Sequence, residues 1–63
     1  MTEIIVVGGA RYRVEGSAEE NEGLIIDAAR GSIMQLAWLT EAETGERLGV
    51  NPEHVVVVRS ISP

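Results

Sequence analysis

This sequence contains no cysteine and no lysine, and its single histidine is His54. The absence of cysteine excludes disulfide bonds and thiolate metal sites, and a lone histidine excludes a histidine-rich site. Sixty-three residues lie near the lower limit at which a chain folds around its own core. Such a domain then depends on efficient packing or on association with other chains. We expect a single domain spanning residues 1–63 and no bound metal or cofactor.

The chain also lacks a long apolar run and an excess of positive charge. No stretch of about 18 apolar residues occurs, so we expect no membrane-spanning helix. Ten carboxylates outnumber five arginines, and the formal net charge is −5. This balance works against non-specific binding to nucleic acid or to an anionic membrane. The N-terminus is acidic where a signal peptide would be basic, so we expect a cytoplasmic protein.

What the chain has in abundance is β-branched apolar residues. Ile4–Val7 and Val55–Val58 are unbroken runs, and the segment 33–39 is nearly one. Neighbouring strand side chains point to opposite faces, so such runs require burial on both faces of a sheet. The sequence predicts only one helix, which covers one face. We expect the other face to meet a second copy of the chain or another protein.

Glycine and serine signals organise the first half of the chain. Gly8-Gly9 predicts a two-residue turn between strands at 3–7 and 11–15, because both glycines accept positive φ. Ser17-Ala18-Glu19-Glu20 matches a capping box and predicts a helix that begins at Ser17 and ends before Gly31. Its expected inward stripe is Leu24, Ile25, Ala28 and Ala29.

The second half of the chain reads as three strands. We expect a strand at 32–42, a turn at Thr44-Gly45, and a strand at 46–50 that pairs Leu39 with Val50. The segment 51–54, Asn-Pro-Glu-His, predicts a type I turn before a last strand at 54–61. The expected fold is a small α+β domain of order β-β-α-β-β-β, with a mostly antiparallel five-stranded sheet and one helix on one face.

The Gly8-Gly9 turn determines which side chains of the first hairpin share a face. With this turn, Ile5 pairs with Tyr12 and Ile4 pairs with Arg13 across the two strands. Side chains of directly paired residues lie on the same face of the sheet. The core face would then carry Ile5, Val7, Tyr12 and Val14. The exposed face would carry Ile4, Val6, Arg11 and Arg13, an apolar surface edged by two cations. We expect Ile4, Val6 and Trp38 to form an interface, although Trp38 suits an intramolecular core equally well.

Arg11, Arg13 and Arg59 are the candidate anion-binding residues. Guanidinium groups bind phosphate and carboxylate, and a subunit cleft could hold a small ligand. The alternative is that these arginines pair with Glu15, Glu41 or Glu53, or rim an interface.

No catalytic motif is present. Ile4–Ala10 superficially resembles the start of a dinucleotide-binding fold, but its glycines lead into a strand and not into a helix. His54 lies in a turn beside Glu53 and Asn51, with no paired nucleophile. We expect no catalytic residue.

A resemblance to known proteins rests on three segments, Tyr12–Ser17, Ala37–Gly45 and Val50–Val55. In order, they resemble short uncharacterised proteins of high-GC actinobacteria and their phages, which combine a hairpin, a helix and a second group of strands. This resemblance implies the fold and identifies no active-site residue.

The leading hypothesis is a non-enzymatic, self-associating protein-interaction module that uses an exposed apolar sheet face. The alternative is a small-ligand or nucleotide-binding protein that sequesters its ligand in an arginine-lined subunit cleft. A nucleic-acid regulator ranks third, because five arginines against ten acidic residues give little positive charge to attract a phosphate backbone.

Overall fold

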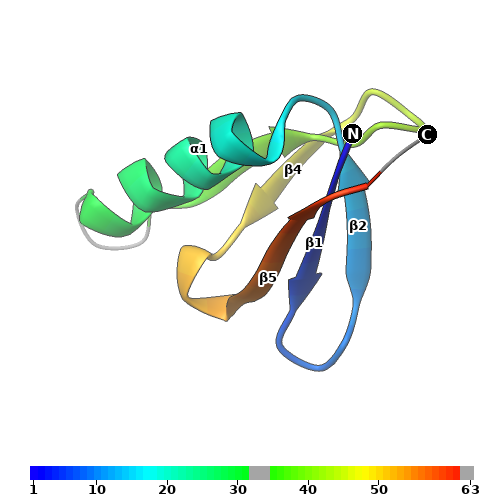
Figure 1. Cartoon of the computed structure of the whole chain (residues 1–63). Coiled ribbons are helices and arrows are strands. Elements are labelled where there is room, and N and C mark those ends of the chain that lie inside the picture. Colours follow the sequence, from blue (N-terminus) through cyan, green and yellow to red (C-terminus); the bar gives the residue numbers. More distant parts are fainter. Residues whose placement is uncertain (32–34, 62–63) are drawn as a thin grey trace.

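The computed structural model describes residues 1–31 and 35–61. These residues form an α+β domain with the predicted order β-β-α-β-β-β (Figure 1). A single turn of 3-10 helix, η1, precedes the last strand, where the sequence predicts a turn. The elements are β1 (Thr2–Val6), β2 (Arg11–Val14), α1 (Ala18–Arg30), β3 (Ala37–Thr40), β4 (Arg47–Val50), η1 (Pro52–His54) and β5 (Val55–Ser60).

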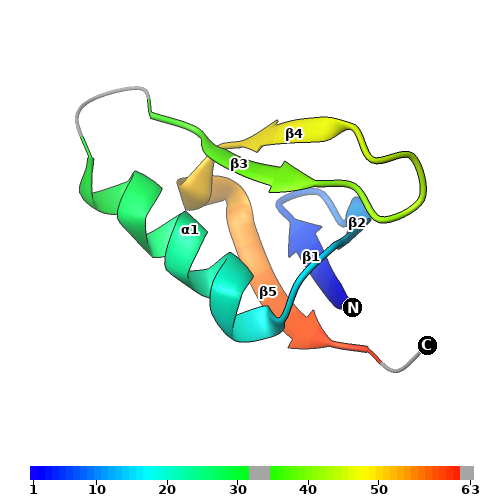
Figure 2. The same ribbon diagram turned by 90° about the horizontal axis from the view of Figure 1, so that it is seen from above.

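The strands form two antiparallel sheets and not the single five-stranded sheet that the sequence predicts. One sheet has the order β2-β1-β5, and the other is the β3-β4 hairpin. A bridge between Val14 and Glu41 joins them. The chain also connects them where β4 leads through η1 into β5, and both sheets contribute buried side chains to one core. Helix α1 contacts both β3 and β5 and lies along one side of the core between them (Figure 2).

The first hairpin has a register one residue away from the predicted one. Ile4 opposes Tyr12, and Ile5 opposes Arg11. The N–H of Val6 donates to the carbonyl of Ala10 at 2.9 Å, so the loop contains Val7 as well as the two glycines. Gly8 and Gly9 have φ angles of 94° and 92°, which this longer loop requires and glycine supplies.

This shift inverts the predicted faces of β1, because a slip of one residue moves every side chain of a strand to the other face. Ile4 is 0% exposed and lies in the core, and Val6 packs against the core. The prediction that Ile4 and Val6 form an exposed surface is therefore wrong. On β2 the faces are as predicted, with Val14 buried and Arg11 exposed.

Helix α1 begins with the predicted capping box. The Ser17 hydroxyl accepts from the N–H of Glu20 at 3.0 Å, and the Glu20 carboxylate accepts from the N–H of Ser17 at 3.0 Å. Ile25 and Ala28 face the core as predicted. Leu24 and Ala29 are exposed, which corrects the expected stripe.

The second hairpin differs from its predicted register by two residues. Ala37 opposes Val50, and Leu39 opposes Leu48. A slip of two residues preserves the faces, so Leu39 and Val50 still share the core face. Strand β3 is shorter than expected, and the predicted strand residues 32–34 lie outside the described residues.

The core is small for the apolar content of the chain. Its buried members come from both sheets and from α1: Ile4, Val14, Ile25, Ala28, Ala37, Leu39 and Val50. Strand β5 joins this core through Val55 and Val58, and an irregularity in its pairing with β1 lies opposite Ile5 and Val6.

Candidate interaction surfaces

Large apolar side chains remain at the surface in greater number than the core holds. Among residues 1–31 and 35–61, seven hydrophobic residues are buried, and two of them are alanines. In the same part of the chain, nine large apolar or aromatic residues are more than a third exposed: Met1, Val7, Tyr12, Leu24, Ile26, Leu36, Trp38, Val56 and Val57. The described residues therefore expose more large apolar side chains than they bury, and Trp38 is among the exposed ones, whereas Ile4 and Val6 are not.

Three of these residues form a contiguous surface, the Trp38 patch, which consists of Leu24, Leu36 and Trp38. Trp38 lies on the outer face of β3 opposite Gly49 and is 51% exposed. A Cβ atom at Gly49 would lie 3.0 Å from Cη2 of Trp38 and 2.9 Å from Cδ1 of Leu36. Both side chains therefore lie over Gly49, whose missing side chain makes room for them. Leu24, from α1, lines a hollow together with Trp38.

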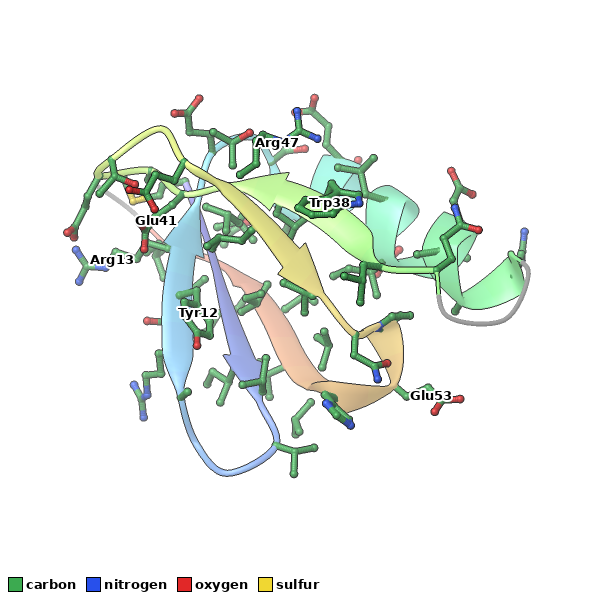
Figure 3. All side chains as sticks on the ribbon, turned by 180° about the vertical axis from the view of Figure 1, so that it is seen from behind. Tyr12, Arg13, Trp38, Glu41, Arg47 and Glu53 are labelled. Carbon is green, nitrogen blue, oxygen red and sulfur yellow. The ribbon has the colours of Figure 1, made fainter. Side chains whose placement is uncertain are left out.

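Charged and polar groups surround this patch. The hollow of about 370 Å³ beside Trp38 is also lined by Glu15, Thr40 and Arg47. Figure 3 shows Trp38 and Arg47 on the β3-β4 hairpin, apart from Tyr12 and Arg13 on β2. Neither Glu15 nor Arg47 forms an ion pair within the described part of the chain. The patch thus has an aromatic centre and rim groups of opposite charge.

The three predicted anion-binding arginines lie on the outer face of the β2-β1-β5 sheet. In one row across the sheet, Glu3 of β1 lies between Arg13 of β2 and Arg59 of β5. In the next row, Ile5 lies between Arg11 and Val57. Nε and Nη2 of Arg59 donate to Oε1 of Glu3 at 2.8 and 2.6 Å. The sequence predicts neither this pair nor its geometry, because Glu3 and Arg59 are 56 residues apart.

A small anion would meet carboxylates on this face. The hollow that Arg11 and Arg13 line, of about 320 Å³, is also lined by Glu3, Glu41 and Glu43. Negative groups that line the same hollow offset the attraction of the two guanidinium groups for a phosphate. These carboxylates therefore weigh against a small-anion site on this face.

A groove that sequence reasoning missed lies between the two hairpins. Val6, Val7 and Tyr12 line one side, and Leu48 and Val50 line the other, around a volume of about 240 Å³. His54 also lines this groove. The inverted register of β1 concealed it, because the predicted faces separate Val6 from Tyr12.

Sequence reasoning also missed Leu24 and Leu36 as surface residues. Adjacent helix positions lie about 100° apart, so Leu24 and Ile25 point in different directions. With Ile25 facing the core, a helical wheel could have indicated that Leu24 is exposed. Leu36 shares its strand face with Trp38 by alternation, which was a usable signal.

Within residues 1–31 and 35–61, no three histidine, aspartate or glutamate side chains gather as a metal site would require. The described helix is neither long nor apolar enough to cross a membrane. No protein-family model, curated protein or solved structure matches this chain.

Proposed function

We propose that this chain is a non-enzymatic, self-associating protein-interaction module that forms a two-fold symmetric homodimer through the Trp38 patch. The observation that carries this proposal is a half-exposed tryptophan, set over Gly49 and flanked by Leu24 and Leu36. Tryptophan is enriched among the residues that dominate interface energies, and a polar rim around an apolar centre is typical of interfaces.

A second copy fits this surface because its rim charges are self-complementary. In a two-fold contact, residue i of one copy meets residue j of the other, and j meets i. Glu15 and Arg47 border the same hollow, so Glu15 of each copy can pair with Arg47 of the other. These two cross-pairs would counter the repulsion between two chains of net charge −5.

Trp38 is also the reporter for this contact, because it is the only tryptophan in the chain. We expect the mass measured by light scattering to approach twice 6.8 kDa as the concentration rises from about 1 to 100 µM. Over the same range the tryptophan emission should shift to shorter wavelength as the indole ring leaves water.

The variant Trp38→Ser should remain a monomer throughout this range, with an unchanged far-ultraviolet circular dichroism spectrum. Val7→Ser is the matched control, because Val7 is 63% exposed but lies in the first hairpin loop outside the patch. It should associate like the wild type. A monomeric wild type at the highest concentration, or a Trp38→Ser variant that still dimerises, would refute the proposal.

A further inference from the structure

Strand β5 forms an open edge of the three-stranded sheet. It is last in the order β2-β1-β5, and among residues 1–31 and 35–61 only β1 pairs with it. It contains neither proline nor lysine, and Arg59, its one charged residue, is bonded to Glu3. Natural proteins usually protect a sheet edge with such residues, because an unprotected edge pairs with other chains. With six residues, β5 is also the longest strand of the described chain.

The pairing with β1 shows which backbone groups of β5 are free. The N–H of Ile61 donates to the carbonyl of Met1 at 3.0 Å, in the register of the β1–β5 pairs. Hydrogen-bonded positions alternate along an antiparallel strand, so Arg59 bonds to β1, whereas the N–H and C=O groups of Val58 and Ser60 point to the open edge. No other backbone segment within the described part of the chain bonds to these groups. An extended polypeptide is the ligand that satisfies such a row.

Helix α1 places an apolar side chain beside this edge. The helix contacts both β3 and β5, and Leu24 lies on its β3 side, next to Trp38. Ile26 follows two positions later and points about 200° away around the helix axis, so it lies on the flank that faces β5. Ile26 is 39% exposed, and Val56, which has no partner on β1, is 64% exposed. A strand added to β5 would cover apolar surface that no other part of the described chain covers.

The same flank of α1 is acidic toward the start of the helix. Glu22 and Glu19 precede Ile26 by four and seven residues and are exposed. Residues at this spacing share one side of a helix. The helix and β5 run in opposite directions, so these carboxylates lie toward Ser60, and Ile26 lies toward Val56 (Figure 2). The flank therefore offers apolar contact at one end of the open edge and negative charge at the other.

We propose that the open edge of β5 binds an extended segment of a partner protein as an added strand, with apolar residues beside Ile26 and basic residues beside Glu19 and Glu22. Backbone hydrogen bonds give such an addition its affinity, and side chains give it specificity. The net charge of −5 attracts a basic segment. Ile26 lies on the flank of α1 opposite to the Trp38 patch, so this surface acts whether or not the chain dimerises.

A second copy of β5 fits this edge less well than a basic segment does. Its one cation is Arg59, which is already bonded to Glu3 at 2.8 and 2.6 Å. A second β5 strand thus brings no free positive charge to Glu19 and Glu22.

Fluorescence anisotropy with a fluorescein-labelled peptide tests the site. In this peptide, threonine alternates with lysine over the first half and with valine over the second half. We expect saturable binding that weakens as salt rises, because lysines meet carboxylates. Two control peptides carry N-methyl groups on one or the other alternate set of backbone nitrogens. In a strand only one set faces β5, so one control should bind about tenfold more weakly and the other should bind normally.

Two pairs of variants locate the peptide on the protein. Ser60→Pro removes an N–H that faces the open edge, where proline is tolerated, and should weaken binding about fivefold. Ser60→Ala keeps this N–H and should bind normally. Glu22→Lys should weaken binding about tenfold. Asp27→Lys is its charge-matched control on the same helix, because Asp27 points about 200° away from the core-facing Ile25. Its affinity should stay within about twofold of the wild type.

Each contrary result overturns a stated part of the proposal. No saturable binding to the wild type, or equal binding of both N-methylated peptides, would exclude an added strand. Equal affinities of Ser60→Pro and Ser60→Ala, or of Glu22→Lys and Asp27→Lys, would place the peptide elsewhere. A loss of self-association in Ser60→Pro would assign the edge to a second copy. Trp38→Ser should bind the peptide normally, which separates this test from that of the dimer.

Discussion

At the scale of single residues, Asn21 is the most constrained polar side chain of the helix. It is 2% exposed and occupies a core-facing position of α1 next to Ile25. Its Nδ2 atom donates to the carbonyl oxygens of Glu15 and Ser17, each at 2.9 Å. Asn21 therefore anchors the chain segment that connects β2 to the helix.

We predict that Asn21→Ala lowers the free energy of unfolding by about 1–3 kcal/mol, because the Glu15 carbonyl loses this donor and the site loses volume. Asn21→Asp should cost more, since it places a carboxylate against two carbonyl oxygens. Urea denaturation measures both values. Glu22→Ala, at an exposed neighbouring position, should change stability by less than about 0.5 kcal/mol. A similarly small change for Asn21→Ala would contradict this role.

At the scale of elements, helix α1 depends on its capping box. The carboxylate of Glu20 accepts a hydrogen bond from the backbone N–H of Ser17. This bond, and after it a hydrogen bond from the Ser17 hydroxyl, hold the pKa of the Glu20 carboxyl below the ordinary value of 4.5. A lowered pKa in the folded state means that ionised Glu20 favours folding. This contribution is present above pH 4.5 and is lost as the pH falls through the lower folded value.

We predict that Glu20→Gln removes this pH-dependent contribution. The difference in melting temperature between wild type and variant should be largest near neutral pH and should shrink below pH 4.5. Thermal melts followed by circular dichroism across this range measure it. A difference that does not vary with pH would mean that the ionised carboxylate contributes nothing to the cap.

At the scale of the whole molecule, two surfaces with different chemistry lie on different sheets. The Trp38 patch belongs to β3 and the adjoining helix, whereas Arg11, Arg13 and Arg59 lie with carboxylates on the outer face of β2-β1-β5. A chain with so small a core gains stability when a partner covers apolar surface, because binding to the folded state alone shifts the unfolding equilibrium.

We predict that the melting temperature of the wild type rises with protein concentration. Each kcal/mol of association free energy should raise it by roughly 4–8 °C for a domain of this size. Scanning calorimetry over about a 100-fold range of concentration provides the measurement. Trp38→Ser should melt at a constant temperature over the range. A wild-type melting temperature that is independent of concentration would exclude coupling between folding and association.

The sequence by itself determined the features that depend on neighbouring residues. The capping box at Ser17, the turn at Asn51 and the alternation of Arg11 and Arg13 with buried Val14 follow from local hydrogen bonds, proline geometry and strand periodicity. The order of the elements follows from the same signals. Trp38 was recognisable as a candidate contact because its residue type and apolar strand were visible without a structure.

Only the tertiary structure decided the features that depend on pairing between distant segments. One additional loop residue, Val7, buried Ile4 and turned Ile5 outward. The division into two sheets and the Glu3–Arg59 pair likewise join parts of the chain that no local pattern relates. The physical reason is that register has a period of two residues, so a single residue in a loop reverses a whole strand.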